Sequence, residues 1–255
     1  MRQNNKSQYT LGVLPWSKEI LEKAYFKDFQ ITRRAIKEHP GFLAHFSLQS
    51  LALSYDIFNN SIEDLFQSIK LFETESSSEN FWFRSEERRF NKLELFIRRG
   101  IFSSTASAMA FVDNCRRVSK DFKPENYEKI KKHNFEENEE HKFIQGLRNY
   151  VSHFRMIEAD WHISWNDKER QLKFLLLHEK LSAWNNWTSL AKKFINRHVD
   201  GISVVALFDN YRKNLSSFND WYRKAIEESA SAELLEYRKY ERILNIIDTQ
   251  CLMKN

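Results

Sequence analysis

The chain of 255 residues is long enough for one large domain or two small ones, each able to bury a hydrophobic core. Its five glycines and three prolines are few for a loop-rich or all-β protein, so the composition favours helices. The formal net charge of +5 permits contact with phosphate groups without requiring it.

Two further features exclude classes of protein. Cys115 and Cys251 lie far apart and outside any CxxC pair, which indicates neither a disulfide framework nor a zinc site. Residues 1–16 contain no apolar segment of the kind found in a secretory signal, and the longest apolar stretches, such as residues 204–208, are too short to span a bilayer. We therefore expect a cytoplasmic protein without membrane contact.

The N-terminal part of the sequence predicts consecutive helices. Ser17 is a suitable N-cap for a helix that would continue to the His-Pro-Gly sequence at residues 39–41. A second helix would run from about residue 41 to 58, and Asn59-Asn60 would then form a turn. A short third helix would end at the serines of residues 76–78.

The central part predicts further helices of different character. A long charged helix would occupy residues 79–97 and end near Gly100, followed by a helix of small residues to about Lys120. A short basic helix would start at Pro124. The next helix is expected at about residues 135–155.

One stretch departs from the helical pattern. Aromatic and β-branched residues at 161–165, an Asn-Asp turn sequence and an apolar run at 172–177 predict a β-hairpin at about residues 160–177. Helices would resume near His178, with breaks at residues 200–201 and near Ser229. Because no segment has the composition of a linker, we expect residues 1–255 to form a single all-α domain, a helical bundle with extra helices and a short β-hairpin insertion.

The helix expected at residues 135–155 carries a group of polar side chains. At about 100° per residue, Asn149 lies about 40° from His153, and Arg148 lies about 140° from it with a long side chain that can reach a shared cleft. The same polar arc of the helix surface also holds His141, Gln145 and Ser152, which we expect to bind substrate. Burying such an arc would be unfavourable, so it should face solvent, a cleft or a subunit groove. Gly146, about 20° from His153, would let a substrate or partner approach closely.

These residue types suit RNA cleavage through attack of the ribose 2′-OH on its own phosphodiester. His153 can move protons near neutral pH, and Arg148 can hold the phosphate and its developing charge. Asn149 would orient the histidine or the phosphate. The substrate supplies its own nucleophile, so we expect neither a metal nor a cofactor.

The Arg-to-His spacing alone has little specificity, because chance gives about one or two such pairs in a chain of this composition. Both Arg33 and Arg34 with His39, and Arg155 with His162, also satisfy it. An ordinary solvated or structural pair is the alternative for Arg148 and His153. Two interpretations likewise stay open for a set of basic residues, which would either follow an RNA backbone or form salt bridges with glutamates along a helix. The set comprises the basic residues between 84 and 99 with Arg116, Arg117, Lys129, Lys131 and Lys132.

The longer run Gly-Leu-Arg-Asn-Tyr-Val-Ser-His at residues 146–153 resembles the signature of the HEPN superfamily. In that family an Arg, usually followed by Asn, Asp or His, precedes a His after four to six intervening residues within a compact helical bundle. Arg148, Asn149 and His153 match this pattern. The resemblance implies a metal-independent endoribonuclease whose two motifs meet across a homodimer interface.

Such proteins are common among bacterial toxin–antitoxin and anti-phage defence systems, so the resemblance also points to an antitoxin or defence-system protein as a partner. In one branch, whose antitoxin is a nucleotidyltransferase, Tyr stands two residues after the His, where this chain has Arg155. The sequence thus leaves two hypotheses: an RNA-cleaving enzyme, or a catalytically inactive helical module that binds nucleic acid or a partner protein.

Overall fold

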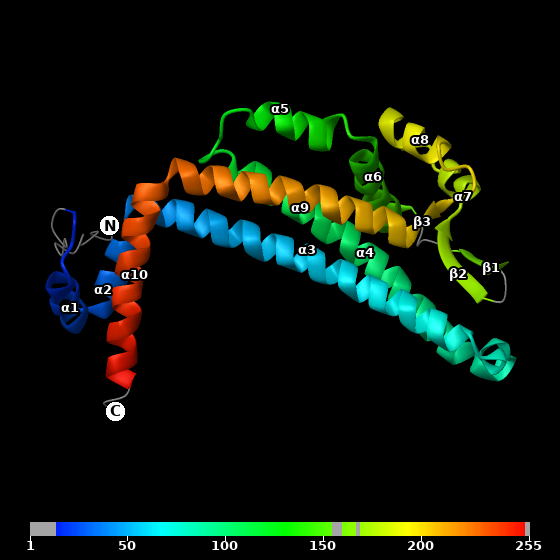
Figure 1. Ribbon diagram of the computed structural model, residues 1–255, viewed down its shortest axis with the longest axis horizontal. Coiled ribbons are helices and arrows are strands. Elements are labelled where there is room, and N and C mark those ends of the chain that lie inside the picture. The colour runs from blue at the N-terminus through cyan, green and yellow to red at the C-terminus, as the bar shows by residue number, and fades with distance from the viewer. Residues whose placement is uncertain (1–13, 155–159, 167–168, 253–255) are drawn as a thin grey trace, which may run out of the picture. The chain divides into compact units, whose positions relative to one another are not determined.

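The computed structural model describes residues 14–154, 160–166 and 169–252, which are mostly helical as the composition predicts (Figure 1). None of the helices in these ranges has the length and apolar character needed to cross a membrane. The chain divides into two compact units: unit 1, Met1–Gln49 with Arg223–Asn255, and unit 2, Ser50–Tyr222. The single domain stays a prediction, because this division does not test whether the units fold together.

Unit 1 is built around a core of aromatic and aliphatic side chains. Its helices are α1 (Lys18–Lys27), α2 (Phe29–Lys37), the start of α3 (Pro40–Ser76), the end of α9 (Val204–Ser229) and α10 (Ser231–Leu252). Trp16 and Leu21 pack there with Tyr240 and Leu244 of α10. The break predicted near Ser229 is confirmed, because α9 ends there.

The N-cap predicted at Ser17 is confirmed, since its hydroxyl accepts the backbone N–H of Ile20 at 3.3 Å. The single helix expected up to residues 39–41 is wrong. It divides at Asp28, where the backbone is extended (φ −159°, ψ 99°), into α1 and α2.

Helix α3 contradicts the turn predicted at Asn59-Asn60, because it continues without interruption to Ser76. Phe58, Ile62 and Leu65 are fully buried on successive turns around these asparagines. Packing of this apolar stripe therefore outweighs the modest helix preference of Asn. The predicted end at the serines of residues 76–78 is confirmed.

Helix α4 contradicts the end predicted near Gly100. Two 3₁₀ turns, η1 (Glu79–Trp82) and η2 (Arg84–Glu86), precede it, and α4 then spans Glu87–Val118. Gly100 is buried within it, and a Cβ there would lie 2.9–3.0 Å from atoms of Leu65 in α3. The Ser104 hydroxyl donates to the Ser61 carbonyl of α3 at 3.0 Å. Glycine and serine thus allow α3 and α4 to pack closely instead of ending a helix.

The remaining helices of unit 2 include α6 (Glu139–His153), which carries the candidate site. The others are α5 (Tyr127–Lys131), the π-helix η3 (Lys132–Glu136), α7 (His178–Ser182) and α8 (Ser189–Asn196). Figure 1 shows α3, α4 and the first part of α9 alongside one another, and the Phe58 ring of α3 meets Tyr211 of α9 edge-on. Helix α6 packs against α4 and α8.

The predicted β-hairpin is confirmed by the antiparallel pairing of β1 (Asp160–Asn166) with β2 (Glu169–Leu176). Residues 167–168, where the turn was predicted, lie outside the described residues. A third strand that the sequence did not predict, β3 (Ile202–Ser203), pairs with the end of β2. The predicted break at residues 200–201 is confirmed, and Gly201 (φ 100°) adopts there a conformation that suits glycine.

Candidate functional site

An aromatic cluster fixes the buried face of helix α6. The Phe143 ring stacks on Trp187, with 5.3 Å between ring centroids, and on Phe194 of α8, with 5.0 Å. Tyr150 stacks on the same Trp187 at 5.8 Å and meets Trp184 edge-on at 5.6 Å. Because these rings lock the rotation of α6, they also determine which side chains its opposite face presents.

Gly146 belongs to this buried face. A Cβ at this position would lie 2.6 Å from two ring carbons of Trp187, so only glycine admits the indole. The sequence predicted that Gly146 leaves room for a substrate or partner, and this prediction is wrong, because Trp187 of the same chain fills the space.

The opposite face of α6 borders a groove. Three of the predicted site residues, Gln145, Arg148 and Asn149, line a cavity of about 280 Å³ between α6 and α4. The wall from α4 consists of small, apolar and charged side chains: Ala106, Met109, Ala110, Asp113 and Arg116. Of the three surroundings expected for this face, namely solvent, a cleft or a subunit groove, Arg148 and Asn149 therefore border a cleft, and α4 supplies its other side.

The groove has an excess of positive charge. Arg148 donates from Nη1 to the Asn149 Oδ1 at 3.2 Å, which holds the two side chains together. Across the groove, Arg116 donates from Nη1 to Asp113 Oδ1 at 2.7 Å. Two guanidinium groups therefore share the groove with one carboxylate. Their planar arrays of N–H donors are suited to phosphate oxygens.

His153 lies at the end of α6, one helical turn after Asn149, and its side chain is exposed. Ser152 beside it is also exposed, and neither residue lines the groove. No hydrogen bond joins the imidazole of His153 to another residue in the part of the chain that the structure describes. The imidazole is therefore accessible from solvent and to a second protein.

His141 is placed differently from the expectation. It is fully buried (0% exposed), between the rings of Phe135 and Tyr211, and its Nδ1 lies 2.7 Å from the Tyr211 hydroxyl. Burial, with a smaller contribution from the nearby positive charges of Lys142 and Arg116, lowers the pKa of His141 to about 3. His141 was predicted to be exposed and to bind substrate. This prediction is wrong, because Tyr211 of α9 and Phe135 of η3 cover the start of α6.

The sequence indicated Arg116 only as one of the basic residues that could follow an RNA backbone, and it did not indicate Asp113 at all. Ala106, Ala110 and Asp113 recur along α4 at a spacing that places them on one helix face. This pattern marks a face with small side chains, but only the packing of α4 against α6 shows what lies opposite.

Comparisons with known protein families, with curated proteins and with solved structures found no match to this chain.

Proposed function

We propose that this protein is a metal-independent endoribonuclease and that the groove between α4 and α6 binds the RNA backbone. One observation carries the proposal. Arg148 and Asn149 share the groove with Arg116 on the facing helix, and His153 is exposed one turn further along α6. Phosphate-binding groups and a proton-transfer group thus lie at one end of a single helix.

The groove residues have complementary roles in binding. Arg148 and Arg116 neutralise a phosphodiester from opposite walls, and each guanidinium can donate two hydrogen bonds to it. The Asn149 and Gln145 amides provide further hydrogen bonds to phosphate or sugar oxygens. Charge neutralisation supports binding of any RNA sequence, whereas the amides restrict the pose of the ligand.

The proposed reaction uses a nucleophile within the substrate. The ribose 2′-oxygen attacks the adjacent phosphorus and loses its proton, the bond from phosphorus to the 5′-oxygen breaks, and that oxygen gains a proton. The products are a 2′,3′-cyclic phosphate and a 5′-hydroxyl. A neutral His153 accepts the first proton, and Arg148 stabilises the charge on the non-bridging oxygens.

One imidazole does not both accept and donate a proton in the same step. The proposal therefore includes a homodimer in which each protomer contributes one His153. This arrangement agrees with a helical bundle of the HEPN type, which the resemblance of residues 146–153 implies. The resemblance also supports a role as a bacterial toxin or anti-phage effector in the cytoplasm, with an antitoxin or defence-system partner.

The direct test is RNA cleavage by the purified protein in excess chelator. We expect cleavage by the wild type and at least about a hundredfold loss in Arg148→Ala and in His153→Ala, because each change removes a group that acts in the transition state. Arg34→Ala and His133→Ala are matched controls, since both side chains are exposed and lie outside the groove. These controls should retain wild-type activity.

The products and the substrate provide independent checks. Cleaved ends should carry 2′,3′-cyclic phosphate, and RNA that is 2′-O-methylated throughout should remain intact while still binding. Equal traces of cleavage from all five proteins would indicate a contaminating nuclease and reject the enzyme. Binding of RNA without cleavage would instead support the inactive helical module.

A further inference from the structure

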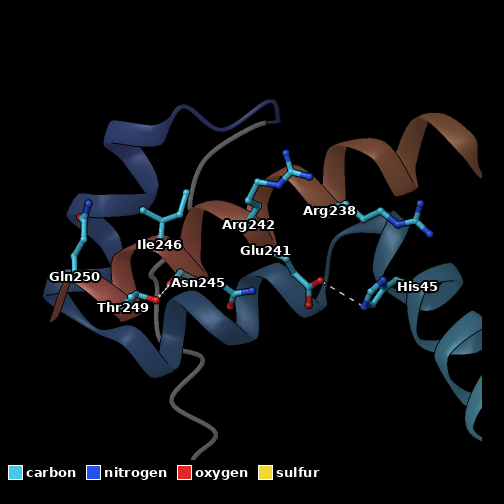
Figure 2. Close-up of a pocket in the computed structure, with 8 residues that line it drawn as sticks. All are labelled: His45, Arg238, Glu241, Arg242, Asn245, Ile246, Thr249 and Gln250. Atoms are coloured by element: carbon cyan, nitrogen blue, oxygen red, sulfur yellow. Dashed lines mark hydrogen bonds and ion pairs between the residues drawn. The ribbon is translucent and has the colours of Figure 1, made fainter. Parts of the chain in front are cut away.

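Unit 1 contains a second cavity that the proposed nuclease does not use. Its volume is about 730 Å³, within the range typical of small-molecule sites. The exposed face of α10 forms most of its lining, and His45 near the start of α3 forms the rest. Figure 2 shows the lining side chains along one length of α10, with His45 beside the end that carries Glu241 and Arg238.

Two arginines give this cavity its positive charge. Arg238 and Arg242 lie one turn apart on α10, and both are exposed. Arg238 has an ion pair with Glu227 at 3.3 Å, whereas no described residue forms an ion pair with Arg242. Figure 2 shows their guanidinium groups pointing in different directions, but both side chains are exposed, so an anion at this face can draw the two guanidinium groups together and relieve the repulsion between like charges one turn apart.

The carboxylate of the cavity is held in a fixed position. Glu241 accepts a hydrogen bond from the buried Tyr237 hydroxyl at 2.8 Å, and its other oxygen lies 3.4 Å from His45 Nε2. The His45 ring also packs on Tyr237, with 4.9 Å between centroids. In Figure 2 the Glu241 carboxylate points towards His45, and the Arg242 guanidinium points away from this pair. Glu241 therefore does not neutralise the positive charge of Arg242. Its carboxylate can accept a hydrogen bond from a hydroxyl group of a ligand.

The rest of the lining suits an uncharged ligand body. Ile246 is 45% exposed and offers an apolar surface next to the arginines. Asn245 and Gln250 add amide groups that can donate and accept hydrogen bonds. The cavity thus combines cations, a fixed acceptor and an apolar surface, which are the contacts needed for a phosphate, hydroxyl groups and a ring.

We propose that this cavity binds a phosphate monoester of a hydroxylated small molecule, such as a nucleoside or sugar phosphate. Arg242 binds the phosphate, and Arg238 adds a second guanidinium when its side chain turns from Glu227. Glu241 accepts a hydrogen bond from a sugar hydroxyl, and Ile246 packs against the ring. A continuous polyanion fits less well, because a backbone-binding surface needs a series of cations and this lining contains a carboxylate between its two arginines.

Isothermal titration calorimetry of the full chain tests the proposal with AMP, ribose 5-phosphate and inorganic phosphate. We expect AMP and ribose 5-phosphate to bind at one site per chain, and Arg242→Ala to weaken both by about tenfold or more, the usual effect of losing a charged hydrogen-bond donor. Lys239→Ala is the matched control, because Lys239 is exposed on the same helix but does not line the cavity. Glu241→Gln should weaken ribose 5-phosphate more than inorganic phosphate.

Five results would overturn the proposal. The first three are no saturable binding of AMP or ribose 5-phosphate at millimolar concentration, equal affinity of Arg242→Ala and wild type, and inorganic phosphate binding as tightly as the esters. The fourth is binding of a single-stranded oligoribonucleotide, titrated in parallel, when neither ester binds. Binding that disappears in Arg148→Ala but persists in Arg242→Ala would belong to the groove of unit 2 and would also reject it. None of these measurements requires RNA cleavage, so the proposal and the nuclease can fail separately.

Discussion

Helix α6 carries two histidines in opposite environments. His141 in its first turn is fully buried against Tyr211, and burial lowers its pKa to about 3. His153 in its last turn is exposed. The residue type and the helix are the same, so the neighbouring elements alone decide that one imidazole stays neutral and structural while the other is accessible to a substrate.

The two faces of α6 show the same contrast between buried and exposed residues. One face holds Gly146 and the aromatic rings against Trp187, whereas the other presents Arg148 and Asn149 to the groove. Changes on the buried face should therefore affect stability, and changes on the groove face should affect ligand binding or catalysis. Mutations on each face test this separation.

The largest effect is expected from Gly146→Ala. The added methyl group would overlap Trp187 at 2.6 Å, and relieving the overlap requires movement of an indole that also packs on Phe143 and Tyr150. We expect a loss of about 1–3 kcal/mol in the free energy of unfolding, despite the better helix propensity of alanine. Urea denaturation measures it, with the exposed Ser152→Ala as a control. Unchanged stability would show that Trp187 is not seated against Gly146.

The second prediction concerns acid stability. Below pH 6.5 the unfolded chain protonates His141, whereas the folded chain resists protonation until about pH 3. His141 should therefore make the protein lose about 1.4 kcal/mol of stability for each pH unit as the pH falls from about 6.5 towards 3. Urea denaturation at several pH values between 7 and about 5 gives the slope of the free energy of unfolding against pH. This slope should be smaller for His141→Gln than for wild type.

Comparing slopes isolates His141 from other groups. Burial raises the pKa of Glu140, which acts in the opposite direction because the folded state then binds a proton more readily than the unfolded state. Both proteins keep Glu140, so its contribution cancels in the difference. Identical slopes would mean that His141 is not held neutral by burial.

Local signals predicted much of the fold. The cap at Ser17, the hairpin strands and the break at Gly201 depend on interactions between residues close in sequence, which a pattern can reveal. The helix ends predicted at residues 59–60 and at Gly100 were wrong for a different reason. The buried contact between Gly100 and Leu65 depends on how two helices pack, and the helix preferences of single residues do not predict it.

For the candidate site too, local sequence signals predicted the helix face but not the contacts between helices. Periodicity correctly placed Arg148 and Asn149 on a polar face, because that face depends only on helix geometry. It could not show that Tyr211 covers His141 or that Arg116 faces Arg148, since these contacts join distant parts of the sequence. Whether His153 acts in catalysis stays a prediction.

A smaller effect is expected on the groove face from Asp113→Asn. Asp113 accepts a hydrogen bond from Arg116 and competes with a phosphate for it. Because this pair is largely exposed, freeing Arg116 should tighten binding of a 2′-O-methyl oligoribonucleotide by only about two- to fourfold at low salt. Fluorescence anisotropy measures the affinity, and Glu94→Gln controls for charge, since it frees Arg98 on the same helix outside the groove. Equal tightening in both variants would argue that Arg116 has no special place in binding.

The smallest effect is expected on the stability of Arg148→Ala and His153→Ala. Both side chains are exposed, and the only partner of Arg148 in the described residues is its neighbour Asn149 at 3.2 Å. Their removal should change the free energy of unfolding by less than about 0.5 kcal/mol, in contrast to Gly146→Ala. Urea denaturation under the same conditions makes the comparison direct. A loss of several kcal/mol in either variant would mean that the pair stabilises the fold, and a matching loss of RNA cleavage would then no longer identify these residues as catalytic.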